Sequence, residues 1–493
     1  MSLSANKTRM PGAFLWTVDD PRIARITVLL ALTLGFLVAR WPMPVLALFV
    51  VAALAIGVAS SREFALGAIL VSSLTMLSVM SWFGLPARTG LLTKAVIGLF
   101  VLTVLLDLGP KNPLRVPSPL TVLVAVLAVS AAVTSGSVFV AFYALAVILA
   151  APVAYVAILH STITMQSLRR LALIVLVIGV AQVPLVLVQS RYLPHVDLMG
   201  GTFGDVGGTH IQSVVMGFAW TIAVALLFGR RRIWLLPVVL AIATVLLVSE
   251  AKAGFVFAVI GTISVGLAKA IANPKHGVPA LVKYGTIAAV AVGTLFGAYL
   301  FLGALLPGGQ QSASSWVTFL TNPAAVRNYL FSYDELGNAG RLEGTRLVLS
   351  QPSTTADLLI GRGIGLLTRA GLLGRAEVAS SASFSGALDR ATSMTKSLYE
   401  IGLLGTLLYC AVVGSAVGAV AKSWTSRTDE LDVAVVAAAA GSAVVYVAAA
   451  LYYAPWTTDA IAVPFWCLMG MAVKWGYLRQ ANRELEQGAE VSP

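Results

Sequence analysis

Charged side chains are scarce in this chain: only 11% of its 493 residues are Asp, Glu, Lys or Arg, whereas 58% are hydrophobic. A soluble globular domain carries about 25% charged residues, so this balance excludes an ordinary soluble protein. Apolar runs of roughly 16 to 24 residues recur along nearly the whole chain, and each is long enough to cross the hydrocarbon core as a helix. Alternating segments of about ten residues, typical of membrane β-barrels, are lacking. The sequence therefore predicts an all-α polytopic membrane protein.

Cysteine is almost absent as well. The chain has two cysteines, Cys410 and Cys467, and both fall inside expected membrane spans. This pattern excludes a disulfide framework and a zinc site, so we expect neither a metal nor another cofactor. The polar and basic N-terminal segment has no small-residue cleavage site after the first apolar run. We therefore expect the first span to remain as an anchor.

About fourteen spans can be delineated from the apolar runs. They are Ile26–Ala39, Met43–Ala59, Phe64–Phe83, Leu91–Leu106, Leu120–Thr134, Val138–Leu159, Leu171–Gln189, Ile211–Phe228, Trp234–Ser249, Ala253–Ile271, Val282–Leu305, Ser397–Ala421, Val433–Tyr453 and Ala460–Gly476. The expected organisation is an N-terminal segment (1–25), helices 1 to 11 (26–305), a long loop (306–396), helices 12 to 14 (397–476) and a C-terminal tail (477–493).

The basic residues predict how the chain is oriented. Lys and Arg near helix ends tend to stay in the cytoplasm. Placing the N-terminus inside puts most of the 33 Lys and Arg residues on the cytoplasmic face. The prediction is a bacterial cytoplasmic (inner) membrane protein with both termini cytoplasmic and the long loop extracytoplasmic. The net charge of +12 is then mainly a topology signal, and no nucleic-acid partner is expected.

The long loop is the largest polar interruption in the chain, and it is expected to carry two short helices, Ser315–Tyr333 and Arg341–Ser350. A membrane protein has little reason to keep such a loop unless the loop performs chemistry or binds an anion. Arginine suits pyrophosphate because its planar fork donates two hydrogen bonds to paired oxygens. The alternative is a basic loop that contacts anionic lipid headgroups. The basic residues of this loop are Arg327, Arg341, Arg346, Arg362, Arg369, Arg375, Arg390 and Lys396.

Two shorter segments on the same predicted face also contain candidate residues. A glycine-rich stretch from Met199 to His210 precedes a helix, where backbone amides can approach an anion closely. Tight loops between membrane helices are often glycine-rich for purely structural reasons. Glu250 and Lys252 lie in a short turn between two spans, where ionisable residues are functional candidates by default. The alternative is that they are interface residues at two helix ends, with Lys252 extended towards water.

Four segments, taken in order, resemble the O-antigen ligase and O-antigen polymerase superfamily. They are Gly201-Thr202-Phe203-Gly204-Asp205, the turn that ends in Lys252, Gly340-Arg341-Leu342-Glu343 running to Gly361-Arg362-Gly363-Ile364-Gly365, and Leu398-Tyr399-Glu400-Ile401-Gly402-Leu403-Leu404-Gly405. The resemblance covers roughly 200–405.

The resemblance implies metal-independent glycan transfer at the outer face of the membrane. The donor would be a glycan linked to polyprenyl pyrophosphate, and the acceptor would be another glycan, with membrane lipids around both. Lys252 would take the position of a family arginine, and Arg341 would face the leaving group. Fixed cations near the departing oxygens would stabilise the charge that develops there. The first expected external loop, Arg40-Trp41-Pro42, lacks the carboxylate of metal-dependent membrane glycosyltransferases.

Two sets of site residues follow from the motifs and the resemblance. The catalytic candidates are Arg341, Lys252, Glu250, Glu343 and His210. The substrate-binding candidates are Arg346, Arg362, Gly201, Thr202, Asp205 and Lys396.

Three functions remain open at this point. The family's ligases carry a histidine just before the segment that corresponds to Leu398–Gly405, and this chain has no histidine after His276. A polysaccharide polymerase is therefore favoured over a ligase. A transporter or lipid flippase is the third possibility, although the sequence shows neither charge clusters at mid-membrane nor the internal repeats common in carriers.

Overall fold

The computed structural model describes residues 55–82, 90–108, 115–134, 138–192, 199–203, 208–230, 235–249, 252–272, 322–332, 340–350, 354–364, 392–423 and 430–491, with single positions at 279, 282, 286, 293 and 297. The chain divides into two units, 1–57 and 58–493, and everything below concerns the second. Within the described residues all regular structure is helical, with no strand. The predicted all-α class is therefore confirmed for this part of the chain.

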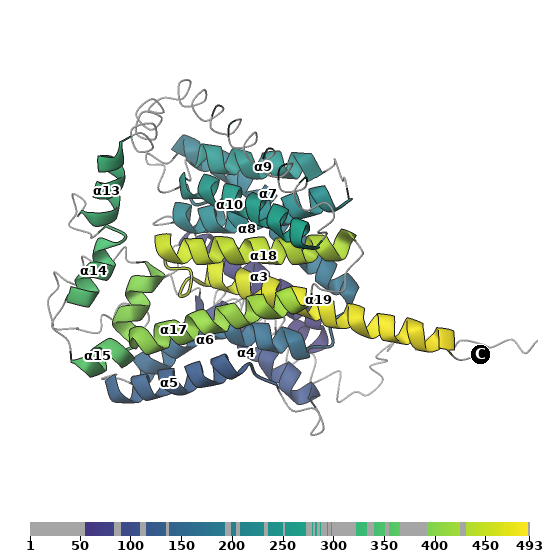
Figure 1. The fold of residues 1–493 in the computed structure, drawn as a ribbon, viewed down its shortest axis with the longest axis horizontal. Helices are drawn as coiled ribbons and strands as arrows, with labels where there is room; N and C mark the ends of the chain where they lie inside the picture. The colour runs from purple at the N-terminus through teal and green to yellow at the C-terminus, as the bar shows by residue number, and fades with distance from the viewer. Residues whose placement is uncertain are drawn as a thin grey trace, which may run out of the picture. The chain divides into compact units, whose positions relative to one another are not determined.

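The helices are labelled in Figure 1. Those of the first half are α3 (Arg62–Trp82), α4 (Gly90–Asp107), α5 (Ser118–Thr134), α6 (Val138–His160), α7 (Met165–Tyr192), the 3-10 turn η2 (Gly201–Phe203), α8 (Gly208–Arg230), α9 (Leu236–Val248) and α10 (Lys252–Ala272). Those of the second half are α13 (Pro323–Phe331), α14 (Glu343–Ser350), α15 (Thr355–Ile360), α17 (Ser393–Lys422), α18 (Glu430–Tyr452) and α19 (Asp459–Val491).

Seven helices of the described chain are long and apolar enough to cross a membrane: α6, α7, α8, α10, α17, α18 and α19. Each coincides with one of the spans expected from the sequence. α9 and the helical stretch Ser118–Ala131 are apolar but shorter. A multi-pass membrane protein is thus supported, whereas the total of about fourteen spans stays a prediction. The span expected at Ile26–Ala39 lies outside the described residues, as do most of those at Met43–Ala59 and Val282–Leu305.

Three of these helices, α8, α10 and α18, pack closely together. Glycine makes the close approach possible: a Cβ on Gly441 of α18 would lie 2.4 Å from the methyl of Thr221 on α8. A Cβ on Gly261 of α10 would lie 2.4 Å from the hydroxyl of the same threonine. Small residues at such crossings are how membrane helices gain van der Waals contact.

The order of these contacts gives the helix directions. Near Gly217 of α8 lie Phe257 of α10 and Val445 of α18, and four residues further along α8, Thr221 meets Gly261 and Gly441. α10 therefore runs in the same direction as α8, and α18 runs opposite to both. The N-termini of α8 and α10 and the C-terminus of α18 consequently lie at one end of the bundle, which we call the site end.

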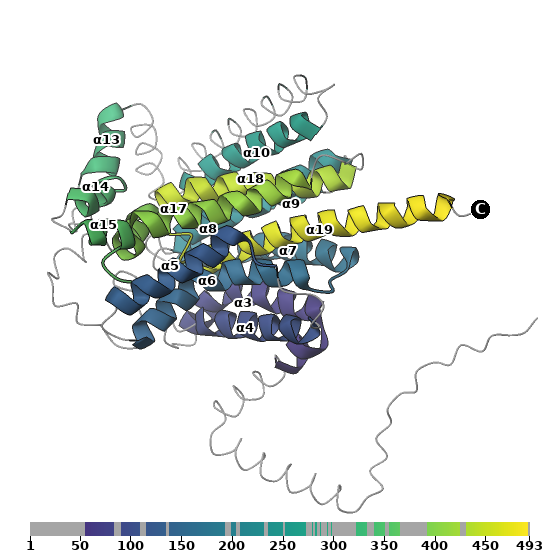
Figure 2. The same ribbon diagram turned by 60° about the horizontal axis from the view of Figure 1, so that its bottom comes forward.

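The N-terminal part of α19 is buried in the bundle, where the helix contacts α3, α6, α7, α8, α17 and α18, and its C-terminal part extends beyond the bundle (Figure 1). Its aromatic residues Phe465 and Trp466 are fully buried: Phe465 stacks on Tyr446 with 3.8 Å between ring centroids, and Trp466 meets Tyr155 edge to ring at 5.6 Å. The helices α3 and α4 lie side by side and contact α19 and α6 respectively, which is easiest to follow in Figure 2. Aromatic packing of this kind fixes α19 rigidly relative to its neighbours.

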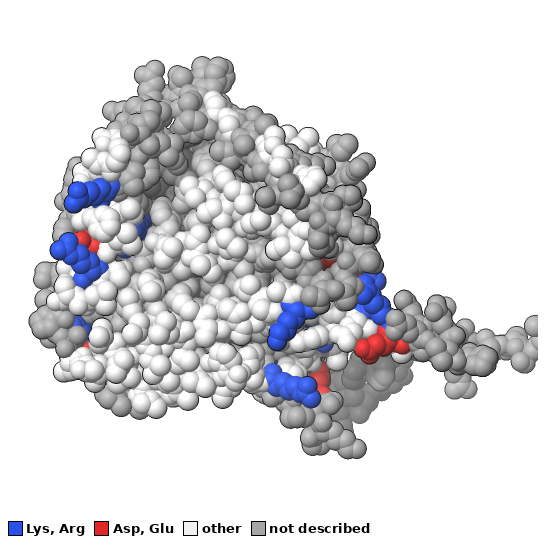
Figure 3. Space-filling view, viewed as in Figure 1, with Lys and Arg blue, Asp and Glu red and all other residues white. Residues whose placement is uncertain are grey.

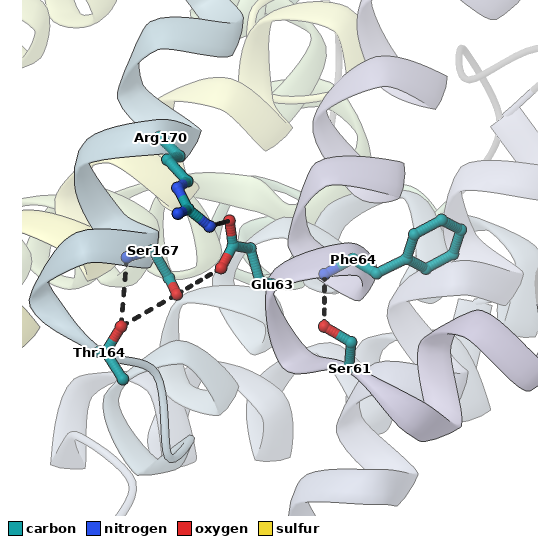
Figure 4. Close-up of polar contacts among 6 residues, drawn as sticks. All are labelled: Ser61, Glu63, Phe64, Thr164, Ser167 and Arg170. Atoms are coloured by element: carbon teal, nitrogen blue, oxygen red, sulfur yellow. Dashed lines mark hydrogen bonds and ion pairs between the residues drawn. The ribbon is translucent and has the colours of Figure 1, made fainter. Parts of the chain in front are cut away.

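The opposite end of the bundle is held by ion pairs between helix ends. Glu63, in the first turn of α3, accepts a hydrogen bond of 2.6 Å from the Ser167 hydroxyl and an ion pair of 3.2 Å from Arg170 (Figure 4). The Ser167 hydrogen bond, together with Arg170, holds the pKa of the Glu63 carboxyl below its usual value. Arg62 makes a similar pair with Asp107 at the end of α4. These contacts place the N-termini of α3 and α7 at the same end.

Charged side chains on the visible face gather at the two ends of the helices (Figure 3). Between them lies a broad surface without charged groups among the described residues. An uncharged band flanked by charge is what a protein surface in contact with hydrocarbon requires.

Candidate functional site

Arg341 and His210, two of the sequence-predicted catalytic residues, meet at one tyrosine. The Nδ1 atom of His210 lies 3.0 Å from the Tyr452 hydroxyl oxygen. The guanidinium carbon of Arg341 lies 5.0 Å from the centre of the Tyr452 ring, within cation–π range. The ring of Tyr453 also approaches His210, at 5.5 Å between centroids. We call these four residues the Tyr452 cluster.

Helix ends bring the cluster together. His210 is in the first turn of α8, and Tyr452 is the last residue of α18, so the antiparallel packing of these helices places both at the site end. Arg341 comes from a turn that is fixed by two backbone hydrogen bonds to the end of α13: Gly340 N–H donates to Ser332 O, and Leu342 N–H donates to Leu330 O. A Cβ on Gly340 would lie 2.7 Å from Leu330 O, so only glycine permits this turn. The position of Arg341 is therefore set by backbone geometry.

The helix expected from Arg341 to Ser350 is present as α14, although it begins two residues later, at Glu343. Arg341 lies in the turn immediately before it. The carbonyls of Gly340 and Leu342 accept the amides of Gly344 and Arg346, so this turn leads directly into α14. The hydrogen bonds from Gly340 and Leu342 to the end of α13 fix the turn and with it the backbone of Arg341.

Lys252 is the first residue of α10, at the same end of the bundle. Five residues later in α10, Phe257 contacts the ring of Tyr452 with centroids 6.2 Å apart. The helix that begins at Lys252 therefore packs against the Tyr452 cluster. The Lys252 side chain, Glu250 and Asp205 lie outside the described residues, and their proposed roles stay predictions.

Hydroxyl groups connect α14 to the start of α17, directly beside the cluster. The Thr345 and Thr395 hydroxyls lie 2.8 Å apart, and Thr392 caps α17 by accepting the Thr395 amide. Ser393 links the same helix end to the α18–α19 connection: its amide donates to Tyr453 O at 2.8 Å, and its hydroxyl accepts from Trp456 N–H. The loop helix, the α17 N-terminus and the Tyr452 cluster thus form one hydrogen-bonded region.

Two further candidates, Glu343 and Arg346, form an ion pair on α14. The buried Glu343 carboxylate lies 3.7 Å from Arg346 Nη1, and its Oε2 has no hydrogen-bond donor within the described protein. The Arg346 side chain is 76% exposed. A buried carboxylate with unused acceptor capacity beside a solvent-accessible guanidinium suits the binding of a polar group.

Lys396 lines a small pocket at the α17 N-terminus together with the buried side chains of Glu400 and Trp456. Trp456 stacks on Tyr409 at 4.4 Å between centroids, and both residues line this pocket. The space is about 20 Å³, too small to enclose a sugar, so binding of substrate by Lys396 stays a prediction.

Arg362 belongs to a segment that fills a break in α17. Gly402 has φ 68° and ψ −173°, so α17 is interrupted there. The loop after α15 closes the gap: Arg362 N–H donates to Tyr399 O at 2.9 Å, and Gly363 N–H to Glu400 O at 3.3 Å. The Arg362 guanidinium carbon lies 5.3 Å from the Tyr399 ring centre. The backbone carbonyls of Tyr399 and Glu400, which the break leaves without helical partners, thus accept hydrogen bonds from the loop.

Gly201 and Thr202 already have partners inside the protein. The Gly201 amide donates to Gln189 and the Thr202 amide to Gln182, while the Thr202 hydroxyl donates to Leu74 O. A Cβ on Gly201, where φ is 57°, would overlap the Gln182 side chain. These contacts connect η2 to α7 and α3, and binding of substrate by Gly201 and Thr202 stays a prediction.

The aromatic residues of the site were missed by sequence analysis. Tyr452, Tyr453 and Trp456 lie at the junction of two spans, where aromatic side chains are common as interface anchors. Their clustering within five positions opposite a polar loop was the available signal. Within the described part of the chain, no group of three His, Cys, Asp or Glu residues is positioned to hold a metal ion.

Comparison with known proteins adds no identification: the chain matches no protein-family model and no curated protein.

Proposed function

We propose that this protein is a membrane glycosyltransferase that transfers a glycan from a polyprenyl-pyrophosphate donor to a hydroxyl group of an acceptor glycan. The convergence of Arg341 and His210 on Tyr452 carries the proposal. The Arg341 guanidinium, which is permanently charged, and the His210 imidazole both contact Tyr452 at the site end of the bundle. This is the pair of groups that departure of a pyrophosphate and deprotonation of a hydroxyl would use.

In the proposed reaction the acceptor oxygen attacks the anomeric carbon while the bond from that carbon to the pyrophosphate oxygen breaks. The electron pair leaves with the pyrophosphate, where Arg341 would stabilise the developing negative charge. The proton of the acceptor hydroxyl would pass to His210 Nε2. That role requires the tautomer in which Nδ1–H donates to the Tyr452 oxygen.

The proposed topology has about fourteen spans, with both termini in the cytoplasm and α13 to α15 outside the bacterial inner membrane. The Tyr452 cluster would then face the outer leaflet, where donor and acceptor glycans are presented. In this arrangement Lys252, at the start of α10, and Arg346 and Lys396, beside the cluster, would provide further cations for the pyrophosphate. Repeated transfer would make the enzyme a polysaccharide polymerase.

The decisive experiment is to incubate purified protein with lipid-linked repeat units and to separate the products by size. A ladder indicates polymerisation, and a single shifted species indicates ligation. Arg341→Ala is expected to lower the rate by about 10² to 10³-fold, the usual cost of removing one group that stabilises transition-state charge. Arg327→Ala, on the exposed surface of α13, is the matched control and is expected to retain the wild-type rate.

Full activity of Arg341→Ala would refute the assignment. A flippase, the alternative from a different class, is distinguished in deletion cells. Un-extended lipid-linked units accumulating at the outer face support the enzyme, whereas accumulation at the inner face supports the flippase.

A further inference from the structure

A second concave region lies at the end of the bundle opposite the Tyr452 cluster. It is an open crevice between α7, α8, α18 and α19, four helices that are each long and apolar enough to span a membrane. The space inside it for a ligand is about 210 Å³. This is less than the roughly 300 to 1,000 Å³ of sites that enclose a whole small ligand, and it suits part of a longer apolar chain.

The walls of the crevice are almost entirely apolar. α18 contributes Leu431, Ala434, Val435, Ala438 and Ala439. The other three helices add leucine, isoleucine, alanine and methionine side chains, with Trp475 of α19 at the same level as Leu431. The alanine side chains of α18 end at Cβ, so they leave the space between the helices open. An apolar chain is the ligand that such walls would bind.

The length of the crevice fits one leaflet of a membrane. Leu431 and Ala439 are eight residues apart on α18, which corresponds to roughly 12 Å along the helix axis at about 1.5 Å per residue. This is less than half of the hydrocarbon thickness of about 30 Å. A groove of this length accommodates part of an acyl chain, and it is too short to be a passage through the bilayer.

One charged group stands among the residues that line the crevice. Arg169, the fifth residue of α7, is exposed, and its guanidinium carbon lies 5.2 Å from the ring centre of Trp475. Its neighbour Arg170 is turned to Glu63 instead. A cation held over an aromatic ring at the mouth of an apolar groove matches an anionic headgroup attached to a hydrocarbon chain.

We infer that this crevice is a binding site for one anionic phospholipid, with an acyl chain between α18 and α7 and the phosphate at Arg169. The lipid belongs to the leaflet on the α7 N-terminal side. It would fill apolar volume that otherwise lacks contacts and would connect four helices, two of which, α8 and α18, carry residues of the Tyr452 cluster at their other ends. The inference does not depend on the reaction that the protein catalyses.

The test is native mass spectrometry of the full chain after equilibration with equimolar phosphatidylglycerol and phosphatidylcholine of identical acyl chains. The wild-type protein is expected to retain one molecule of phosphatidylglycerol in preference to phosphatidylcholine. Arg169→Gln should reduce that preference by about fivefold, the effect of one basic residue at a membrane surface. Arg170→Gln is the matched control and should keep the preference.

A second variant tests the apolar part of the site. Ala438→Phe places a ring in the crevice and should abolish retention of either lipid, and thermal unfolding in the same detergent verifies that the variant is folded. Equal effects of Arg169→Gln and Arg170→Gln would overturn the headgroup assignment. Undiminished lipid retention by folded Ala438→Phe would overturn the site itself.

Discussion

At the scale of single residues, Tyr452 makes two separable contacts. Its hydroxyl contacts His210 Nδ1, whereas its ring lies against the Arg341 guanidinium. Removing the hydroxyl alone therefore tests how far it orients the His210 imidazole, because the ring that lies against Arg341 remains. This division of roles exists only because two segments more than 100 residues apart in the chain meet at one side chain.

The Tyr452→Phe variant should lower kcat by about tenfold and leave KM for the lipid-linked donor nearly unchanged. The reason is that the ring below Arg341 remains, while the contact that orients His210 is lost. The Tyr452→Leu variant removes the ring as well, so KM should rise in addition. Both constants are measured with purified protein and lipid-linked repeat units.

The Tyr477→Phe variant, at an exposed position of α19, is the control for loss of a tyrosine hydroxyl and should behave as wild type. If Tyr452→Phe had wild-type kcat, His210 would not depend on this hydroxyl.

At the scale of elements, the break in α17 is the feature that joins the long loop to the membrane bundle. A Cβ on Gly402 would lie 2.4 Å from Leu359 O, and a Cβ on Gly361 would lie 2.3 Å from Glu400 O. Both glycines have positive φ, at 68° and 85°. The two backbones approach so closely that neither position accepts a side chain.

Gly402→Ala is therefore expected to destabilise the protein by about 2 kcal/mol or more, through backbone strain together with steric overlap. Gly414→Ala is the matched control on the same helix, where a Cβ meets nothing within 4 Å. It should be neutral or stabilising by about 0.5 to 1 kcal/mol, because alanine favours a helix over glycine. Thermal unfolding in detergent measures both, and equal melting temperatures for the two variants would contradict the docking of α15 into the break.

The sequence predicts elements better than it predicts their interruptions. Apolar runs located the helices because burial in hydrocarbon dominates each span, as for Val433–Tyr453, observed as α18 (Glu430–Tyr452). The same periodicity runs through Gly402 without a signal, since the break depends on amides that Arg362 and Gly363 supply from a distant loop. The helix expected from Arg341 begins two residues later for a similar reason, because the turn at Arg341 is set by the carbonyls of Leu330 and Ser332.

The site could be predicted in part. The polar composition of the loop directed attention to Arg341, and the position of His210 at the start of a span placed it on the same predicted face. Their common partner could not be foreseen, because Tyr452 ends an apolar helix and has the composition of an ordinary interface anchor. The contacts between side chains of α8, the loop and α18 depend on how these segments pack together. No local pattern in the sequence predicts that packing.

At the scale of the whole molecule, the two ends of the bundle are chemically distinct. The site end carries the Tyr452 cluster and the Lys94–Asp459 ion pair of 2.5 Å, which joins α4 to α19. The opposite end carries Arg169 and two ion pairs, Arg170 with Glu63 of α3 and Arg62 with Asp107 of α4. Glycan transfer from a lipid carrier at the outer face requires that only the first of these ends be extracytoplasmic.

Cysteine labelling in intact cells measures this orientation directly. Ser350, the last residue of α14, and Gln166, in the first turn of α7, are both exposed and lie at opposite ends of the bundle. In a Cys410→Ala background, which removes the exposed native thiol, Ser350→Cys should react with a membrane-impermeant maleimide. Gln166→Cys should react only after the membrane is permeabilised. The reverse pattern would place Arg341 and His210 in the cytoplasm, where donors already exported to the outer face could not reach them, and the proposed reaction would then have to be abandoned.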